Sequence, residues 1–474
     1  MRVYFINPPA SEGVKIVREG RCMQRAGAWT AVWPPISLAL SAAVARNLNM
    51  EPKLSDCIVE DIDFIKLSKL IKEFAPSLIV INTATPSIVS DLSVAALAKK
   101  INPKIKVAAF GIHVSALPED SFRIEPALDI IVRGEPESTI AELTLGLQEG
   151  KNLSGIAGLS FRQGPRIIHN PERSAIENLD SLPFPAWDLI DRSKYILPFT
   201  TDKEFLLVAT SRGCPFGCLF CADRAYYGNK LRLFSPVKIV DGMVQAKRNF
   251  GIDTFLFWAE SFTINQKFAE AVSDEIIKRN EKFTWICNSR VDHVNLSLLK
   301  KFKSAGCIMV GYGIESGNQG VLDSAGKGIT IEQIKEAARM TKKAGLQTVG
   351  HCIIGLPGET RNTIAQTVKF VKKLDLDFAQ FYCAVPFPGS ALYEAAKERG
   401  WINTGNWTYF EQNYSVMDLD KLTARETMKL RHWAYLSFYL RPKMVYRTLM
   451  RIKSWKQFLN FCGMVWEFFD WAKT

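Results

Sequence analysis

The sequence contains no uninterrupted run of eighteen or more apolar residues, which excludes an ordinary membrane-spanning helix. It also lacks a recognisable signal peptide, because residues 1–9 have the pattern of a strand. Ten cysteines are present, but the seven that lie outside one short loop show none of the paired spacing of a disulfide framework. We therefore expect reduced thiols and a cytoplasmic protein.

Most of the chain lacks an excess of basic residues, although the net charge is +12. Residues 421–474 hold eleven Lys and Arg against three acidic residues, so this tail carries eight of the twelve excess charges. Because the rest of the chain is nearly balanced, we predict no nucleic-acid partner. A chain of 474 residues with 47% hydrophobic and 23% charged residues is expected to form two or three globular domains.

Three cysteines, Cys214, Cys218 and Cys221, lie close together in a loop that contains two glycines and a proline. Such a loop can curl three thiolates around one small inorganic group. A four-iron cluster normally takes four cysteines, so three would leave one iron open, and an open position distinguishes a reactive metal site from a structural one. The alternative is a zinc knuckle, whose fourth ligand would have to come from outside the loop, where Cys287 and His293 are the next candidates.

Five short apolar runs alternate with four stretches of helical apolar spacing in residues 1–145. The expected strands are residues 3–7, 54–58, 78–83, 107–111 and 130–134, and the expected helices are residues 37–47, 62–74, 88–101 and 137–148. This alternation predicts an α/β domain with a parallel, doubly wound sheet of the flavodoxin-like (Rossmann-like) type. Ligands of such sheets lie at the carboxyl ends of the strands, where this sequence has polar, small or flexible residues.

Residues 146–202 are predicted to link this domain to the next one. Within them, residues 159–168 have the pattern of a small hairpin around a Gln-Gly-Pro turn. Residues 179–187 contain too much proline for a helix or a central strand.

Residues 203–400 alternate strand and helix six times. The expected strands are residues 205–210, 254–259, 284–288, 309–314, 348–354 and 378–385. A closed TIM barrel needs eight such units, so six predict a partial (β/α)6 barrel that is open on one side. Its site is expected at the carboxyl ends of the strands, several of which are followed by charged or hydroxyl side chains.

The tail, residues 401–474, has helical spacing in residues 431–439 and 444–471. Basic residues precede an aromatic-rich amphipathic stretch there, a pattern typical of a helix that lies on an anionic membrane surface. The alternative is a helix that packs over the open barrel and covers the substrate. The first interpretation predicts a peripheral position on the inner face of the membrane.

The cysteine loop resembles the signature of the radical S-adenosylmethionine (radical SAM, AdoMet) superfamily, including the aromatic Phe220 just before the last cysteine. The resemblance implies that Cys214, Cys218 and Cys221 hold a [4Fe-4S] cluster whose fourth iron is chelated by AdoMet. It further implies a reductant such as flavodoxin or ferredoxin, and cleavage of AdoMet to a 5′-deoxyadenosyl radical that abstracts hydrogen from unactivated carbon.

The same resemblance implies an AdoMet pocket at the strand ends of the barrel. An arginine there can grip a carboxylate in a fork, and a glutamate can accept hydrogen bonds from an ammonium or a ribose hydroxyl. The residues implied are Phe220, Glu260, Ser289, Arg290, Glu315, Ser316, Gly355 and Pro357.

The N-terminal domain resembles the cobalamin-binding domain that is fused to many radical SAM enzymes. The implied cobalamin contacts are Thr83, Thr85, Ser87, Gly111, His113, Gly134 and Glu135. The Asp-x-His-x-x-Gly motif that ligates cobalt in classical cobalamin domains is missing after the first strand. The domain could instead be a degenerate scaffold that binds no cofactor.

The resemblance implies a cobalamin-dependent enzyme that methylates an unreactive carbon. The alternative within the family is radical cyclisation, rearrangement or carbon–carbon coupling on a lipid or tetrapyrrole-like substrate, and the alternative of another class is a non-catalytic cobalamin or Fe–S sensor. Tyr312, His351 and Cys383 lie in predicted barrel strands and are candidates for hydrogen donation or substrate positioning. The alternative for each of them is a role in core packing. The partner is expected to be a small-molecule or lipid substrate.

Overall fold

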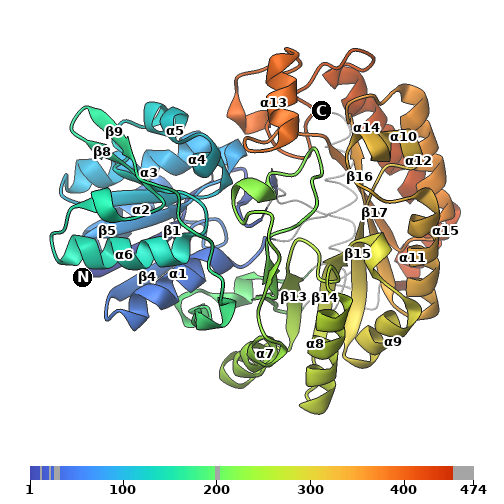
Figure 1. Cartoon of the computed structure of the whole chain (residues 1–474), viewed down its shortest axis with the longest axis horizontal. Helices are drawn as coiled ribbons and strands as arrows, with labels where there is room; N and C mark the ends of the chain where they lie inside the picture. The colour runs from blue at the N-terminus through green and yellow to red at the C-terminus, as the bar shows by residue number, and fades with distance from the viewer. Residues whose placement is uncertain (11–12, 21–22, 26–31, 198–202, 452–474) are drawn as a thin grey trace.

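The computed structural model describes residues 1–474 apart from 11–12, 21–22, 26–31, 198–202 and 452–474. Two large sheets, one in the N-terminal third and one in the middle of the chain, lie side by side (Figure 1). Across the described ranges, no helix is both long enough and apolar enough to cross a bilayer.

The first large sheet has seven strands in the order β4-β1-β5-β6-β7-β8-β9. Its parallel strands are β1 (Arg2–Asn7), β4 (Glu51–Asp56), β5 (Leu78–Asn82), β6 (Lys106–Phe110) and β7 (Ile130–Val132). One face is covered by α1 (Ile36–Asn47) and α6 (Pro136–Gln148), and the other by α2 (Phe64–Phe74) and α3 (Ile88–Ile101). Burial on both faces explains the continuous apolar runs, and the predicted doubly wound sheet is confirmed.

The predicted hairpin is present as β8 (Leu159–Gln163) and β9 (Arg166–His169), but its position differs from the prediction. Strand β8 pairs antiparallel with β7, so the hairpin extends the first sheet instead of belonging to a linker. The irregular connection to the second sheet follows His169.

The second large sheet is the partial barrel, with six parallel strands in chain order. These are β10 (Leu206–Ala209), β13 (Thr254–Trp258), β14 (Thr284–Ser289), β15 (Cys307–Glu315), β16 (Gln347–Ile354) and β17 (Phe378–Cys383). The helices that cover it are α7 (Pro236–Phe250), α8 (Gln266–Lys278), α9 (Leu296–Ser304), α11 (Ile331–Lys343) and α12 (Arg361–Lys373). Among the described strands β10 and β17 do not pair, so the barrel is open as predicted.

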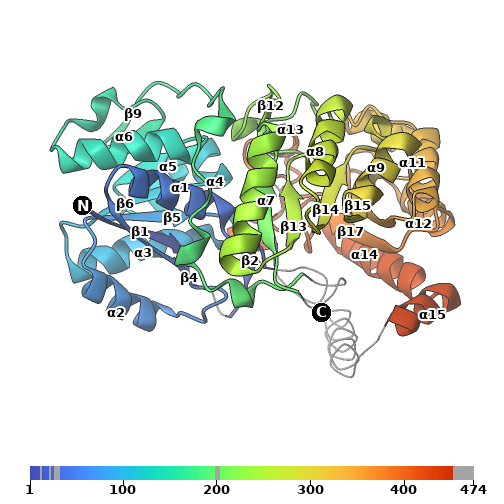
Figure 2. The ribbon, with the colours of Figure 1, turned by 90° about the horizontal axis from the view of Figure 1, so that it is seen from below.

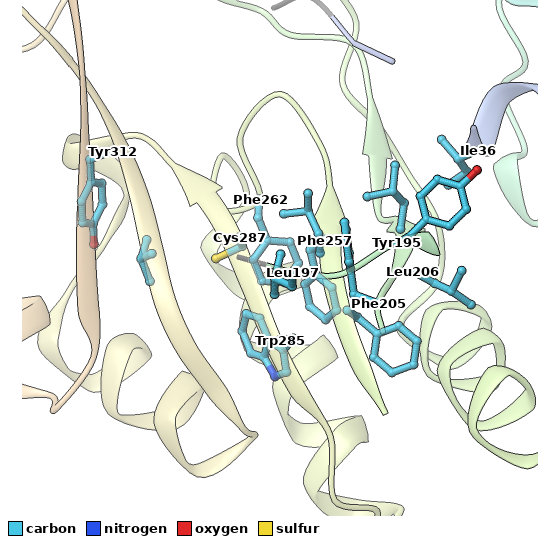
Figure 3. Packing of buried hydrophobic residues seen from close by; sticks show 14 of the residues in the cluster. Ile36, Tyr195, Leu197, Phe205, Leu206, Phe257, Phe262, Trp285, Cys287 and Tyr312 are labelled. Atoms are coloured by element: carbon cyan, nitrogen blue, oxygen red, sulfur yellow. The ribbon is translucent and has the colours of Figure 1, made fainter. Parts of the chain in front are cut away.

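An aromatic core fixes the first barrel strands against their helices (Figure 3). The ring of Phe257 on β13 stacks on Trp285 of β14, with centroids 4.5 Å apart. Phe262, which follows β13, packs edge-on against both rings. Because these side chains are buried, the ends of β13 and β14 are held in fixed positions, and residues of the site follow directly after them.

The tail leaves the barrel through α14 (Ala424–Tyr439) and α15 (Pro442–Arg451), which lie at the end of the molecule remote from the first sheet (Figure 2). Helix α14 begins seven residues before the predicted start, at a capping box formed by Thr423 and Glu426. The second predicted tail helix is described only as far as Arg451, and its aromatic stripe lies outside the described residues.

Candidate active site

The cysteine loop connects β11 (Ser211–Arg212) to a short 3-10 turn at Asp223–Ala225. Gly213 has a φ of +81°, and a Cβ atom there would lie 2.3 Å from the backbone oxygen of Lys230. Only glycine fits this position without displacing the neighbouring backbone. The loop is therefore held tightly at its first cysteine.

Cys214, Cys218 and Cys221 are half-buried, and all three line one cavity at the mouth of the barrel. Across the described residues no three His, Cys, Asp or Glu side chains are grouped closely enough to hold a single metal ion. In an iron–sulfur cluster each thiolate binds a different iron, so the sulfur atoms are not gathered around one ion. Three thiolates that open onto one cavity match the donor set of a four-iron cluster with one open iron.

The cavity has a volume of about 290 Å³ and runs from the cysteines into the barrel. Five of the residues implied for AdoMet line it: Phe220, Glu260, Ser289, Arg290 and Glu315. Ser316, Gly355 and Pro357 do not belong to this lining. The hydroxyl of Ser316 is 3.0 Å from that of Thr367, and the backbone N–H of Gly355 donates to Glu359.

Arg290 is buried beside the cysteine loop, and its guanidinium lies 3.7 Å from the ring centroid of Phe216. Its Nε and Nη2 donate to the carboxylate of Asp292 at 3.0 and 2.9 Å. Nη2 also donates to the backbone oxygen of Lys327 at 2.9 Å. The predicted fork is therefore present, but its Nε, its Nη2 and one face of the guanidinium are already engaged by the protein.

Lys327 is a site residue that the sequence analysis missed. Its Nζ donates to Glu315 Oε1 at 2.7 Å, and both side chains are buried at the cavity wall. Glu315 itself has a φ of +57°, which is unusual for a residue with a side chain. The available signal was the Gly-Lys-Gly sequence at residues 326–328, where two glycines free a loop to turn one cation inward.

Of the three candidates in the barrel strands, His351 and Cys383 line the cavity and Tyr312 does not. Tyr312 lies between Gly311 and Gly313, both of which face the cavity. Alternation along the strand therefore turns Tyr312 outward, where its hydroxyl is 2.8 Å from that of Thr341 on α11. Tyr312 packs between sheet and helix, so the prediction that it acts in the lumen is wrong.

The residues implied for cobalamin lie along the carboxyl edge of the first sheet. The Thr83 hydroxyl donates to Phe110 O, and the Ser87 hydroxyl donates to Asp91. Gly111 approaches Thr83 so closely that a Cβ would lie 2.5 Å from its backbone oxygen. The backbone N–H of Gly134 donates to the Ser115 hydroxyl.

His113 is fully buried at this edge, where its Nδ1 is 3.3 Å from the hydroxyl of Thr85. Its ring meets Trp407 edge-on, with centroids 4.8 Å apart. Burial lowers the pKa of His113 to about 3, so the imidazole is neutral at physiological pH. Its Nε2 has no hydrogen-bond partner among the described residues.

Glu135 has a different place from the one predicted. Its carboxylate forms ion pairs with Arg212 and Arg232, which flank the cysteine loop. Glu137 joins the same group through both Nη atoms of Arg212, at 3.0 and 2.5 Å. All four side chains are buried, so Glu135 connects the two domains instead of facing an open cofactor site.

Two family models match the chain. The model of the radical SAM superfamily matches residues 208–371, and that of the B12 binding domain matches residues 27–144. An uncharacterized methyltransferase of Pyrococcus horikoshii is 36% identical over 449 residues, which cover 95% of each chain. This chain belongs to the cobalamin-binding radical SAM enzymes. The cofactors of this family are a [4Fe-4S] cluster, AdoMet and cobalamin.

Further relatives of this radical SAM enzyme are more distant. The anaerobic magnesium-protoporphyrin IX monomethyl ester cyclase of Rubrivivax gelatinosus is 25% identical over 98% of this chain and 81% of its own length. Among solved structures, the methyltransferase TsrM of Kitasatospora setae, with cobalamin and cluster bound, has a TM-score of 0.68 at 17% identity and covers 85% of this chain and 79% of that one. OxsB, with aqua-cobalamin and AdoMet bound, has a TM-score of 0.72 at 15% identity and covers 99% and 71%. The two structures support the fold.

The sheet edge of this radical SAM enzyme is tightly packed beside Gly111. Arg18 and Glu19, which directly follow the short strand β2 (Ile16–Val17), are buried there, and the Arg18 guanidinium donates to Asp91 and Asn7. The cavity bounded by these residues and Gly111 measures about 20 Å³, which is room for a water molecule and not for a corrin ring. This one cavity is therefore not the site of a corrin ring.

Proposed function

We propose that this enzyme methylates an unactivated carbon of a small molecule in a radical reaction that consumes AdoMet. The observation that carries the proposal is that three cysteines open onto the same cavity as Arg290, which lies beside them at the mouth of a parallel barrel. The methyltransferase relative, at 36% identity over nearly the whole chain, supports methyl transfer as the outcome.

When bound, the cluster supplies the electron that cleaves AdoMet, and cobalamin supplies the carrier for the methyl group. The chain would hold three irons through Cys214, Cys218 and Cys221. The buried pair of Glu315 and Lys327 offers one carboxylate and one ammonium on the same wall, which are complementary to the ammonium and the carboxylate of a bound amino acid. A one-electron reductant such as flavodoxin or ferredoxin would complete the system.

The experiment is anaerobic reconstitution of the full chain, followed by reduction and addition of AdoMet. We expect 5′-deoxyadenosine to form, and no 5′-deoxyadenosine from a variant with Cys214, Cys218 and Cys221 all changed to Ala. Cys57→Ala is the matched control, because Cys57 is buried in the first domain, away from the cavity. A triple variant that still cleaves AdoMet would dismiss the cluster assignment. A wild-type protein that holds the cluster but never cleaves AdoMet would favour a sensor.

Cyclisation is the second candidate, because the magnesium-protoporphyrin ester cyclase aligns with 98% of this chain. The products separate the two reactions. Methyl transfer from AdoMet leaves S-adenosylhomocysteine in addition to 5′-deoxyadenosine, whereas cyclisation leaves only the latter. Turnover of methyl-deuterated AdoMet with a cell extract should therefore give labelled product and S-adenosylhomocysteine.

We also propose that the described end of the tail touches a membrane surface. Leu440, Tyr446 and Met450 are 59%, 65% and 64% exposed. Close by, Lys443 and Arg447 share the single carboxylate of Asp375, which leaves an excess of positive charge. Large apolar side chains beside uncompensated cations are typical of a surface that binds anionic lipid, and a lipid substrate would be reached there.

Sedimentation with vesicles of phosphatidylcholine alone or with phosphatidylglycerol tests this contact. We expect binding only to the anionic vesicles, weakened by salt, and reduced in a Tyr446→Ser, Met450→Ser variant. Ile65→Ser is the control, because Ile65 is 71% exposed on α2 of the other domain. Equal sedimentation of all these proteins would contradict the proposal.

A further inference from the structure

The lower part of the cavity is built from the inward side chains of four neighbouring strands. On each strand one position supplies an apolar side chain, and the position two residues later supplies a polar side chain or glycine. The apolar positions are Ile286 on β14, Met309 on β15, Val349 on β16 and Phe378 on β17, and the positions that follow them are Asn288, Gly311, His351 and Gln380. The lumen thus has an apolar floor below a polar belt.

The absence of a side chain at Gly311 allows the polar side chains of the belt to lie close together. A Cβ atom at Gly311 would lie 2.3 Å from Asn288 Oδ1 and 2.9 Å from His351 Nε2. These two side chains therefore use the space that a larger residue would fill. Tyr382 lies beside them, because its hydroxyl donates to Gln380 Oε1 and is 3.4 Å from His351 Nδ1. The belt brings two amides, an imidazole and a phenol together above the floor.

Carboxylate, ammonium and guanidinium side chains are confined to the opposite end of the cavity from the belt. Among the described lining residues these are Glu260, Arg290, Glu315 and Lys327: the first two follow strands, Glu315 ends β15, and Lys327 pairs with Glu315. A carboxylate or phosphate carried down to the belt would lose its water and meet two amides, a phenol and the His351 imidazole there, but no ammonium or guanidinium on the described wall. An ionised group that is buried without a partner is strongly disfavoured, whereas a hydroxyl or amide can exchange hydrogen bonds with the belt.

We infer that the part of the substrate that enters the barrel is uncharged, and consists of an apolar chain or ring next to a neutral hydrogen-bonding group such as a hydroxyl or amide. This inference rests on the proposed function, because it takes the cavity below the cysteines as the substrate site. The belt would receive the neutral polar group, and the floor would receive the apolar part. Gly311 would set the limit on substrate size.

The test is equilibrium dialysis of radiolabelled decan-1-ol and decanoate against the anaerobically reconstituted full chain with AdoMet bound. The two probes share one apolar chain and differ in the charge of the head group. We expect decan-1-ol to bind at least about tenfold more tightly, since an uncompensated buried carboxylate costs more than the 1.4 kcal/mol that corresponds to tenfold. Equal affinities, tighter binding of decanoate, or binding of neither probe would overturn the inference.

Two variants place the binding in the lumen. Gly311→Val should abolish binding of decan-1-ol, because its side chain needs the space of Asn288 Oδ1 and His351 Nε2. Gly405→Val is the matched control, since a Cβ at the exposed Gly405 meets no atom within 4 Å. Asn288→Leu should lower the affinity for decan-1-ol about fivefold through loss of a hydrogen bond, and it should leave the affinity for decanoate unchanged.

If the Gly311 and Asn288 variants bind decan-1-ol as the wild type does, the probe binds outside the lumen and the inference is overturned. Failure of the proposed function has a different signature. The same preparation, assayed without either probe, would then form no 5′-deoxyadenosine, whatever the ranking of the two probes in dialysis.

Discussion

Glu359 shows how one buried carboxyl group can shape the turn after β16. Its Oε2 accepts hydrogen bonds from the backbone N–H groups of Gly355 and Leu356, at 2.7 and 3.1 Å. Burial raises the pKa of Glu359 to about 8, and these two bonds only partly oppose the shift. The group is therefore protonated in the folded protein at pH 7 and ionised in the unfolded chain.

This difference makes folding stability depend on pH. Because the folded state keeps a proton that the unfolded state has lost, the stability contribution of Glu359 falls as pH rises from the unfolded pKa of about 4.3 to the folded pKa of about 8. Between pH 6 and pH 9 the loss should amount to roughly 2–3 kcal/mol. Glu359→Gln removes this titration, so its melting temperature should fall less than that of the wild type over this range. Glu332→Gln, at an exposed position, should behave as the wild type does.

Some individual site residues could be predicted from the sequence, and others could not. The cysteines were recognisable because all three lie within eight residues. The contact of Lys327 with Glu315 was not, because it depends on how a separate loop folds back over the mouth. Tyr312 was placed inside the barrel because a strand that is buried on both faces is apolar on both sides, so its pattern does not reveal which side faces the lumen.

At the scale of the element, α14 protects the open edge of the barrel. The Tyr439 hydroxyl donates to the backbone oxygen of Ala379 on β17 and accepts from its N–H. The Tyr435 hydroxyl accepts from the N–H of Phe381, and Arg431 Nε donates to the oxygen of Phe381. Side chains of one helix thus satisfy backbone groups that an edge strand would otherwise present to another chain.

Tyr435→Phe should therefore destabilise the barrel by about 1–3 kcal/mol, because it leaves the buried N–H of Phe381 without its acceptor. Urea unfolding monitored by circular dichroism measures the change, and light scattering should show earlier aggregation on heating. The control is Tyr446→Phe on the exposed face of α15, where an effect below about 0.5 kcal/mol is expected. Equal midpoints for the two variants would show that the Tyr435 hydroxyl does not support the edge.

The bounds of the strands were predictable from the sequence, whereas the pairing between strands was less predictable. All eleven parallel strands of the two sheets were expected within three residues of their bounds, because buried strands between helices have a strong local pattern. The hairpin of residues 159–168 was assigned correctly as a hairpin. Its attachment to β7 could not be derived, because pairing between strands depends on contacts across the chain and leaves no local signal.

At the scale of the whole molecule, the two domains are joined by a buried ionic group next to the cysteine loop. Arg212, which precedes Gly213 and Cys214, bonds to Glu135 and Glu137 of the first domain. Burial opposes the charge of Arg212, but Glu137 and Glu135 outweigh it and raise the pKa of Arg212 well above its usual range. The position of the loop therefore depends on carboxylates from the other domain.

Glu137→Gln should destabilise the protein by about 3–5 kcal/mol, because it leaves the buried guanidinium of Arg212 without most of its compensating charge. Since the cysteines follow directly, the variant should also hold less iron per chain after reconstitution. Glu177→Gln, which breaks the exposed pair with Lys230, should cost no more than about 1 kcal/mol and retain its iron. Adding Arg212→Met to Glu137→Gln should restore part of the stability, because the unpaired charge is then gone. If the two single variants unfold at the same urea concentration and bind equal iron, the domains are held together by their apolar contacts and the ionic group has no share in placing the loop.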